Sequence, residues 1–267
     1  MRNSLVRVWA MFLRYFYLHR RSLPRALEII FWPVMELLVW GFLTVYLQRN
    51  VVPSLAQFLI YLIGAMIFWD ILYRSQQGVS LSVMEELWTR NIINLLISPL
   101  RMWEWIAATF IYGMVKIAVI VMVLLVLASF LYSFDITVLG FYLIPFVANL
   151  LFFGWALGTF TAGILLRWGH AAEALIWGIP FVVQPVSAIF YPVNVLPAWL
   201  QPVAHILPST YVFEGMRAVI RDGTFRKEML LLCLALNVLF FLGGALFFAW
   251  MLAQGRRDGR LAKLGVE

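Results

Sequence analysis

Long apolar stretches separated by short polar segments run along almost the whole sequence. A helix needs roughly 20 apolar residues to cross the ~30 Å hydrocarbon core of a bilayer. Five stretches come close to or exceed that length with at most one charged residue each, namely residues 29–47, 54–73, 105–132, 136–166 and 229–253. We predict that each of them forms a membrane-spanning helix.

A further apolar segment, residues 174–213, has no Asp, Glu, Lys or Arg and contains six of the eleven prolines. Proline removes a backbone donor and breaks helices. Broken backbone at membrane depth needs cover from protein or water. The segment is therefore either one span followed by a hairpin that dips into the membrane, or two spans.

The charge at the two ends of the chain decides between these alternatives. Lys and Arg collect on the cytoplasmic side of membrane proteins. The first 25 residues hold six arginines, and the tail after residue 255 holds four basic residues. With both termini in the cytoplasm the number of crossings is even. We therefore expect an all-α membrane protein, a single domain over 1–267 with six spans, the fifth at 171–191, and a re-entrant helical hairpin at 192–213.

The first 24 residues predict an amphipathic helix ahead of the first span. Arg7, Arg14 and Arg21 recur every seven residues and share one helical face, whereas Trp9 and Phe12 lie on other faces. Such a helix lies in the plane of the inner membrane interface. The alternative is that these arginines serve only as the topology signal of the first span.

Composition argues against several classes of protein. Apolar residues make up 64% of the chain and charged residues 12%, whereas about a quarter of the residues in a soluble protein are charged. A soluble enzyme, a disordered chain and a secreted disulfide scaffold do not fit, the last also because Cys233 is the single cysteine. The net charge of +7 follows from membrane topology, so we expect no nucleic-acid partner.

The sequence shows no sign of nucleotide, metal or catalytic chemistry. None of the three lysines, Lys116, Lys227 and Lys263, has the neighbouring Gly and Ser or Thr of a phosphate-binding loop. The three histidines are scattered without metal-ligand spacing. We therefore expect that this chain is not an enzyme and holds no metal or cofactor. A membrane-embedded lipid-modifying enzyme, the least favoured alternative, would need polar groups clustered on one membrane side.

The segment between residues 74 and 104 is the largest predicted cytoplasmic loop. Ser82 and Glu85 have the spacing of a capping box, which predicts a helix from 83 to 97 that ends at a Ser-Pro dipeptide. This helix has an apolar stripe large enough for a partner. The stripe consists of Met84, Trp88, Ile92 and Leu95. It would pack against a partner or, equally well, against the chain's own spans.

Three ionisable residues fall inside predicted spans, which makes them functional candidates by default. They are Glu36, Asp70 and Lys116. Arg74 follows Asp70 by four residues and is its neighbour on a helix. The favoured interpretation is a structural set of ion pairs, such as Glu36 with Lys116. The alternative is a role in the transport path, and an ion-coupled secondary transporter using these three residues is the competing function.

Two further patterns concern packing and surface charge. Gly154 and Gly158 have the small-xxx-small spacing of closely packed membrane helices. A basic cluster before the last span would bind an anionic lipid or glycan, or only meet lipid head groups. It consists of Arg217, Arg221, Arg226 and Lys227.

The order of these elements points to a known family. A basic amphipathic helix precedes the spans, and the first inner loop ends in Leu95-Leu-Ile-Ser-Pro99-Leu-Arg101 before Glu104. The proline-rich outer segment reads Tyr191-Pro-Val-Asn-Val-Leu-Pro197-Ala-Trp-Leu-Gln-Pro202, then Leu207-Pro-Ser-Thr-Tyr211 and Glu214-Gly-Met-Arg217. Over nearly its whole length the chain resembles the membrane (permease) subunits of type-2 ATP-binding-cassette (ABC) exporters.

The resemblance implies a homodimeric half-transporter in the inner (plasma) membrane that works with two copies of a cytosolic ABC ATPase subunit. ATP and magnesium would then bind to that subunit. The resemblance also implies export of an amphipathic or hydrophobic cargo, such as a glycan, glycolipid, lipid or drug, by alternating access or channel opening.

The resemblance further gives roles to two segments. Residues 82–101 would be the coupling helix that docks on the ATPase, and residues 192–213 would close the outer mouth. The implied coupling residues are Glu85, Glu86, Trp88, Arg90, Ser98, Pro99 and Arg101. The implied residues of the outer segment are Tyr191, Pro192, Pro197, Pro202, Pro208, Tyr211, Glu214 and Arg217.

Overall fold

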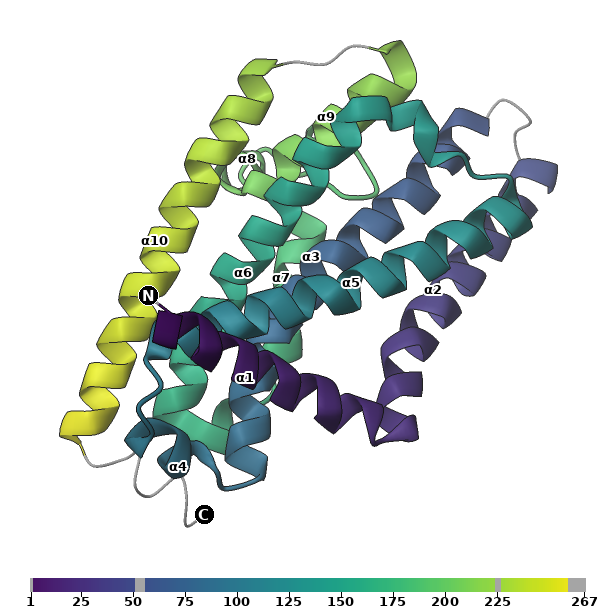
Figure 1. Cartoon of the computed structure of the whole chain (residues 1–267). Coiled ribbons are helices and arrows are strands. Elements are labelled where there is room, and N and C mark those ends of the chain that lie inside the picture. Colours follow the sequence, from purple (N-terminus) through teal and green to yellow (C-terminus); the bar gives the residue numbers. More distant parts are fainter. Residues whose placement is uncertain (1, 51–55, 224–226, 259–267) are drawn as a thin grey trace.

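The computed structural model describes residues 2–50, 56–223 and 227–258, and every regular element in these ranges is helical (Figure 1). The α-helices are α1 (Arg2–Arg20), α2 (Leu23–Asn50), α3 (Ala56–Trp88), α4 (Ile92–Ile97), α5 (Met102–Tyr132), α6 (Leu143–Trp168), α7 (Leu175–Val186), α8 (Gln201–Ile206), α9 (Pro208–Asp222) and α10 (Lys227–Arg257). Short 3-10 turns are η2 (Ile136–Tyr142), η3 (Gly169–Ala172) and η4 (Val193–Val195). The predicted all-α class is confirmed for this part of the chain.

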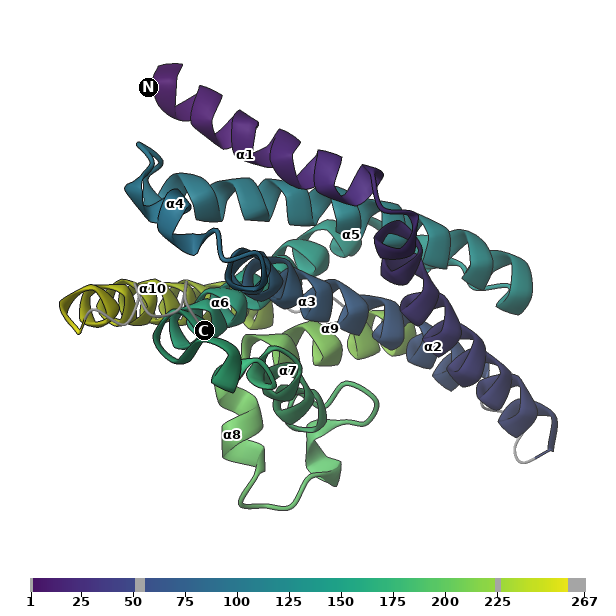
Figure 2. The same cartoon turned by 90° about the horizontal axis from the view of Figure 1, so that it is seen from below.

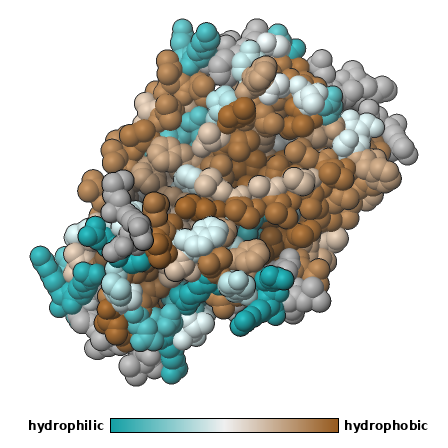
Figure 3. All heavy atoms as spheres, in the orientation of Figure 1, coloured by the Kyte–Doolittle hydropathy of each residue, from teal (hydrophilic) through white to brown (hydrophobic). Residues whose placement is uncertain are grey.

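The long helices form a bundle in which α6 is central. It packs against α3 on one side and α10 on the other, while α1 lies across α5 (Figures 1 and 2). The segment from α7 through α8 projects from one side of the bundle in Figure 2. Hydrophobic residues cover the middle of the face in Figure 3, and hydrophilic ones gather mainly at the lower end, where α4 lies. This distribution suits a protein whose middle is surrounded by lipid.

The predicted glycine pair lies at the contact of α6 with α3. A Cβ atom on Gly154 would lie 1.7 Å from Ser75 Oγ and 2.6 Å from the Leu72 carbonyl oxygen. One on Gly158 would lie 2.7 Å from the Gln76 carbonyl oxygen. Since real Cβ atoms do not approach other atoms this closely, the two helices pack at this distance only because both positions are glycine.

Four stretches of the described residues are long and apolar enough to cross a membrane: Ile29–Leu47, Met102–Tyr132, Ile136–Ala172 and Lys227–Arg257. They contain the first, third, fourth and last predicted spans. The predicted span 54–73 lies in α3 from residue 56 onward, and its first two residues lie outside the described part. Although α3 is 33 residues long, its C-terminal half is rich in Ser, Gln and charged residues.

The segment expected to be a continuous fifth span differs from the prediction. Residues 171–191 contain the end of η3 and then α7, which has 12 residues and includes two prolines. At 1.5 Å per residue α7 is about 18 Å long, too short to cross ~30 Å of hydrocarbon alone. The crossing number of six therefore stays a prediction.

Candidate functional site

The corner between α3 and α5 replaces the single helix predicted for residues 83–97. The α3 helix continues to Trp88, the chain turns through Thr89–Asn91, and α4 has only six residues. Ser82 is not a cap, because its hydroxyl donates to the Val79 carbonyl 2.7 Å away, inside α3. The break comes at Arg90, whose φ of 53° is left-handed and ends the preceding helix.

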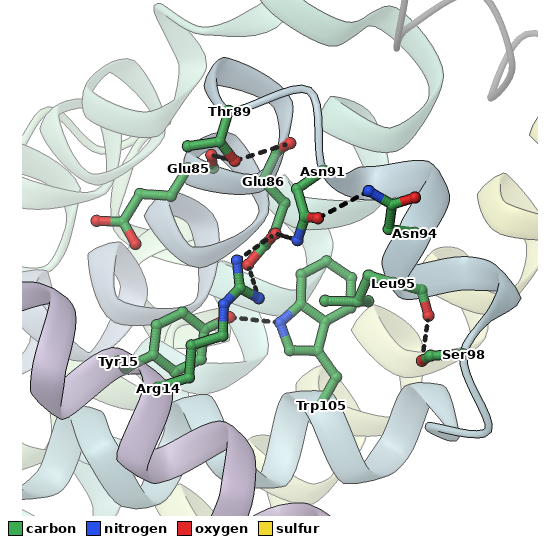
Figure 4. Close-up of polar contacts among 10 residues, drawn as sticks. All are labelled: Arg14, Tyr15, Glu85, Glu86, Thr89, Asn91, Asn94, Leu95, Ser98 and Trp105. Carbon is green, nitrogen blue, oxygen red and sulfur yellow. Dashed lines mark hydrogen bonds and ion pairs between the residues drawn. The ribbon is translucent and has the colours of Figure 1, made fainter.

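Glu86 is the centre of this corner rather than a surface residue (Figure 4). Only 1% of it is exposed, and its carboxylate is 2.6 Å from Arg14 Nη1 of α1. Asn91 donates its side-chain amide to the same carboxylate at 2.7 Å. The sequence-based assignment of Glu86 to the ATPase contact is thus wrong, because its charge is used inside the chain to hold α1 against the end of α3.

A second ion pair fastens α1 to the start of α5. Arg7 donates from Nε and Nη2 to the two carboxylate oxygens of Glu104, both at 2.7 Å, and this hydrogen bonding raises the pKa of Arg7. Glu104 also accepts from the backbone N–H of Arg101 at 2.9 Å, which caps α5. Between the two ion pairs, Trp105 Nε1 donates to the buried Tyr15 hydroxyl at 2.6 Å. The N-terminal helix α1 and the corner between α3 and α5 are therefore connected to each other by these contacts.

The apolar stripe of the corner is mostly internal. Met84, Ile92 and Leu95 are buried in a core shared with α1, α5 and α6, whereas Trp88 is 47% exposed. Trp88 Nε1 lies 3.4 Å from a carboxylate oxygen of Glu173, just before α7. Three residues of the stripe therefore pack against the chain's own helices rather than against a partner. Trp88 is the one that keeps an accessible surface.

The remaining predicted coupling residues lie around Trp88 at this end of the molecule. Arg90, Pro99 and Arg101 are exposed, while Glu85 and Ser98 are half-buried. Sequence reasoning missed Ile97, the last residue of α4, which is 77% exposed. An apolar residue directly before the Ser-Pro dipeptide was the available signal, since a helix end cannot bury its last side chain against the preceding turn.

The three charged residues inside the spans do not form one cluster. Asp70 is buried and accepts from Arg74 Nε at 3.1 Å, which confirms the predicted neighbour contact. No ion pair joins Glu36 and Lys116, both of which lie in the described part, so the expected pairing is wrong. Lys116 Nζ instead lies 5.2 Å from the centroid of the Tyr112 ring.

Glu36, Arg74 and Lys116 all line one cleft of about 820 Å³. Side chains from α1, α2, α3, α5 and α7 surround it, and aromatic residues form much of its wall. A cavity of this size holds a drug-sized ligand or part of a larger one. The cleft therefore combines apolar surface with a few charged groups, the arrangement that an amphipathic molecule requires.

Arg217 organises the outer segment instead of presenting its charge to a ligand. Its Nη2 donates to the carbonyl oxygens of Ala188 at 2.7 Å and Tyr191 at 2.9 Å, and also to the Tyr61 hydroxyl. Its Nη1 lies 2.7 Å from Glu214, which in turn accepts from the Val193 N–H at 2.9 Å. The guanidinium therefore holds the chain reversal after α7, and binding of an anionic lipid or glycan by the basic cluster stays a prediction.

The other predicted outer residues have local roles. Pro202 and Pro208 lie in the first turns of α8 and α9, where the missing N–H has no intrahelical partner in any case. Pro192 and Pro197 bracket η4. The Tyr191 hydroxyl donates to the Pro185 carbonyl oxygen at 2.7 Å. The Tyr211 hydroxyl donates to the His205 carbonyl oxygen at 2.8 Å. The predicted segment 192–213 thus comprises η4, α8 and only the first part of α9.

The rest of the basic cluster is not a combined site. Arg221 is exposed and pairs with the adjacent Asp222, Lys227 starts α10, and Arg226 lies outside the described residues. In the ranges that the structure describes, no group of three or more His, Cys, Asp or Glu residues is arranged to hold a metal ion.

Comparison with known proteins places this architecture in a family. No curated protein matches the chain significantly. The family model described as "ABC-2 type transporter" matches residues 8–220, from α1 through most of α9. That range contains the α1–α3–α4–α5 corner, the cleft and the Arg217 segment. The chain is therefore a membrane protein of the ABC-2 type transporter family, as its sequence indicated.

Proposed function

We propose that this chain is the permease subunit of an ATP-driven exporter that moves an amphipathic or hydrophobic cargo outward across the inner membrane. Two copies of the chain form a homodimer and bind two copies of a cytosolic ABC ATPase, which supplies the sites for ATP and magnesium. Both termini lie in the cytoplasm and the chain crosses the membrane six times. The cargo is a glycan, glycolipid, lipid or drug.

The observation that carries this proposal is the connection of the exposed corner to α1 and α5. Trp88 and Ile97 are exposed at the corner, while its buried Glu86 and Glu104 are ion-paired to Arg14 and Arg7. A displacement imposed on the corner by a partner would therefore move α1 and α5 with it. Both helices line the cleft, so this path connects the docking surface to the cargo space.

The test is Trp88→Ala in the full chain, with its ATPase subunit. Truncation of an aromatic anchor commonly costs at least about 2 kcal/mol of binding free energy. At ~1.4 kcal/mol per tenfold, the affinity for the ATPase should fall at least about 25-fold. ATP hydrolysis stimulated by the permease should fall with it, whereas membrane insertion and dimerisation should be retained.

Trp199→Ala is the matched control, because Trp199 is even more exposed (74%) but lies in the outer segment. This variant should bind the ATPase like the wild type. Full ATPase binding and stimulation by a well-folded Trp88→Ala variant would remove Trp88 as the anchor. Loss of the folded protein would instead favour a purely internal packing role.

A second candidate function is an ion-coupled secondary transporter. It is supported by Glu36 and Lys116, two ionisable residues that line the cleft without an ion-pair partner among the described residues. Transport that persists in vesicles containing this chain alone and responds to an ion gradient would establish it. Transport that requires the ATPase and ATP would exclude it.

A further inference from the structure

The cleft is lined by an acidic and a basic residue that come from different helices. Glu36 lies on α2 and Lys116 on α5, and both side chains line the same cavity of about 820 Å³. Neither has a hydrogen-bond or ion-pair partner in the described residues, and each is only partly exposed. Ionisable groups at membrane depth are costly and normally pair with something. Two opposite charges that line one cavity without pairing therefore indicate a ligand that pairs with both.

The other charged residues of the cleft are already engaged. Arg74 is held by Asp70 at 3.1 Å. His19 lies 3.0 Å from the Tyr15 carbonyl oxygen, and Glu85 has further contacts of its own. The lining holds two acidic residues, Glu36 and Glu85, and two basic residues, Arg74 and Lys116, so its composition favours neither a net anion nor a net cation.

The apolar part of the lining suits a hydrocarbon body. Trp32 and Trp40 of α2 line it together with Trp177 and Phe181 of α7. These flat side chains provide a large contact area, and the rings next to Glu36 add cation–π attraction for a positively charged group.

We propose that this cleft binds a zwitterionic amphiphile, with its anionic group on Lys116 and its cationic group near Glu36. A lipid with a phosphate and an amine in its head group has this chemistry. That this amphiphile is also the exported cargo rests on the proposed function. Its binding to the cleft is a property of the isolated chain and is tested without ATP or ATPase.

The experiment measures equilibrium binding of three radiolabelled probes to the purified full chain in an uncharged detergent. The probes share one acyl chain and differ in the head group: lysophosphatidylethanolamine is zwitterionic, lysophosphatidylglycerol is anionic, and an acylcholine is cationic. Hydrogen bonds to charged groups typically contribute enough for about a tenfold or larger effect. The wild type should therefore bind the zwitterionic probe at least about tenfold more tightly than either other probe.

Each single variant should remove one part of this head-group preference. Lys116→Gln should remove the preference for the zwitterionic over the cationic probe, and Glu36→Gln that for the zwitterionic over the anionic probe. Lys227→Gln and Glu228→Gln are matched controls, because both residues are exposed at the start of α10 and outside the cleft. They should retain the wild-type preference.

Equal binding of all three probes by the wild type would overturn the inference, and this result does not depend on any variant folding. Retention of the full preference in both well-folded cleft variants would overturn it as well. Because ATPase binding of the wild-type chain is measured separately, a chain that couples to its ATPase but shows no head-group preference would leave the proposed function standing and remove only this inference.

Discussion

The two sides of the bundle differ in how their helices meet. On the side of α3, α6 and α10, the backbones approach so closely that a Cβ on Gly244 would lie 2.8 Å from the Ala156 carbonyl oxygen. On the side of α1, α2, α5 and α7, the helices leave a cleft of about 820 Å³, and a Cβ on Gly113 would meet no atom within 4 Å. The first side is closely packed throughout these contacts. The second, hollow side, together with one face of α3, encloses the cleft, although α2 and α5 meet closely where a Cβ on Gly41 would lie 2.1 Å from the Tyr132 ring.

The polar residues of the two sides also differ, although α1 forms ion pairs with α5 through Arg7 and Glu104 and with α3 through Arg14 and Glu86. On the closely packed side they pair with one another across helices: Gln76 Nε2 donates to Thr161 at 3.3 Å and Asn237 Nδ2 to Asn149 at 2.8 Å. On the hollow side Glu36 and Lys116 line the cleft without such partners. Buried polar groups that bond to one another stabilise one arrangement of the helices, whereas the unpaired ones are free to meet a ligand. Under the proposed function, the closely packed side is the scaffold and the cleft serves transport.

The largest effect is expected where the close packing is disturbed. Gly154→Ala should cost up to about 3 kcal/mol, because the new methyl group would lie 2.6 Å from the Leu72 carbonyl oxygen and the helices would have to separate. Gly113→Ala is the matched change on the hollow side. It should be neutral or stabilise by about 0.5–1 kcal/mol, since Ala is the better helix former and the space is open.

Thermal unfolding of both variants in the same detergent measures this difference. Equal stabilities for the two alanine variants would contradict the division into a packed and a hollow side.

A smaller effect is expected from the ion pair that joins α1 to the corner. Arg14→Gln should cost about 1–2 kcal/mol, because it leaves the buried Glu86 carboxylate with Asn91 alone, while the partial exposure of Arg14 limits the loss. The double change Arg14→Met with Glu86→Met should be milder than the sum of the single changes. A double-mutant cycle in chemical unfolding checks this, with an expected coupling of about 0.5–3 kcal/mol. Strict additivity would show that the two residues act independently.

The smallest effect concerns the loop that joins the two sides. Asp135 accepts from the hydroxyl and the N–H of Thr137 at 2.6 and 2.8 Å, and these hydrogen bonds lower its pKa. A lowered pKa in the folded state stabilises above the unfolded-state value of about 3.9, and this contribution is lost as the pH falls through the folded-state pKa. Asp135→Asn should therefore lower the melting temperature slightly at pH 7, and the difference from the wild type should shrink as the pH falls below about 3.9 toward the folded-state pKa. A difference that grows on acidification would contradict this assignment.

Much of the architecture could be predicted from the sequence, since it depends on local patterns. Spans without charges appear as helices at the expected places, and the spacing of Gly154 and Gly158 predicted a close helix contact, whose partner in the structure is α3. The contact of Asp70 with Arg74 followed from helical periodicity alone. Such features need no knowledge of which helices become neighbours.

The errors concern partners distant in the chain. Glu86 was assigned to the surface because nothing in the spacing shows that Arg14, far earlier in the sequence, reaches it. The contacts of Arg217 were not expected, because its partners are backbone carbonyls around Ala188, which no side-chain pattern marks. The pairing of Glu36 with Lys116 assumed that neighbouring spans touch where the structure has the cleft.

The most direct test of the account follows the cleft while the ATPase works. In the Gly113→Cys variant, reconstituted with its ATPase in lipid nanodiscs, a thiol reagent reports access to the cleft, whereas the native Cys233 is buried. The account predicts that ATP changes the labelling rate of residue 113, and that Trp88→Ala abolishes the change. A labelling rate that does not change with ATP, but changes with an ion gradient in vesicles containing the chain alone, would contradict this account.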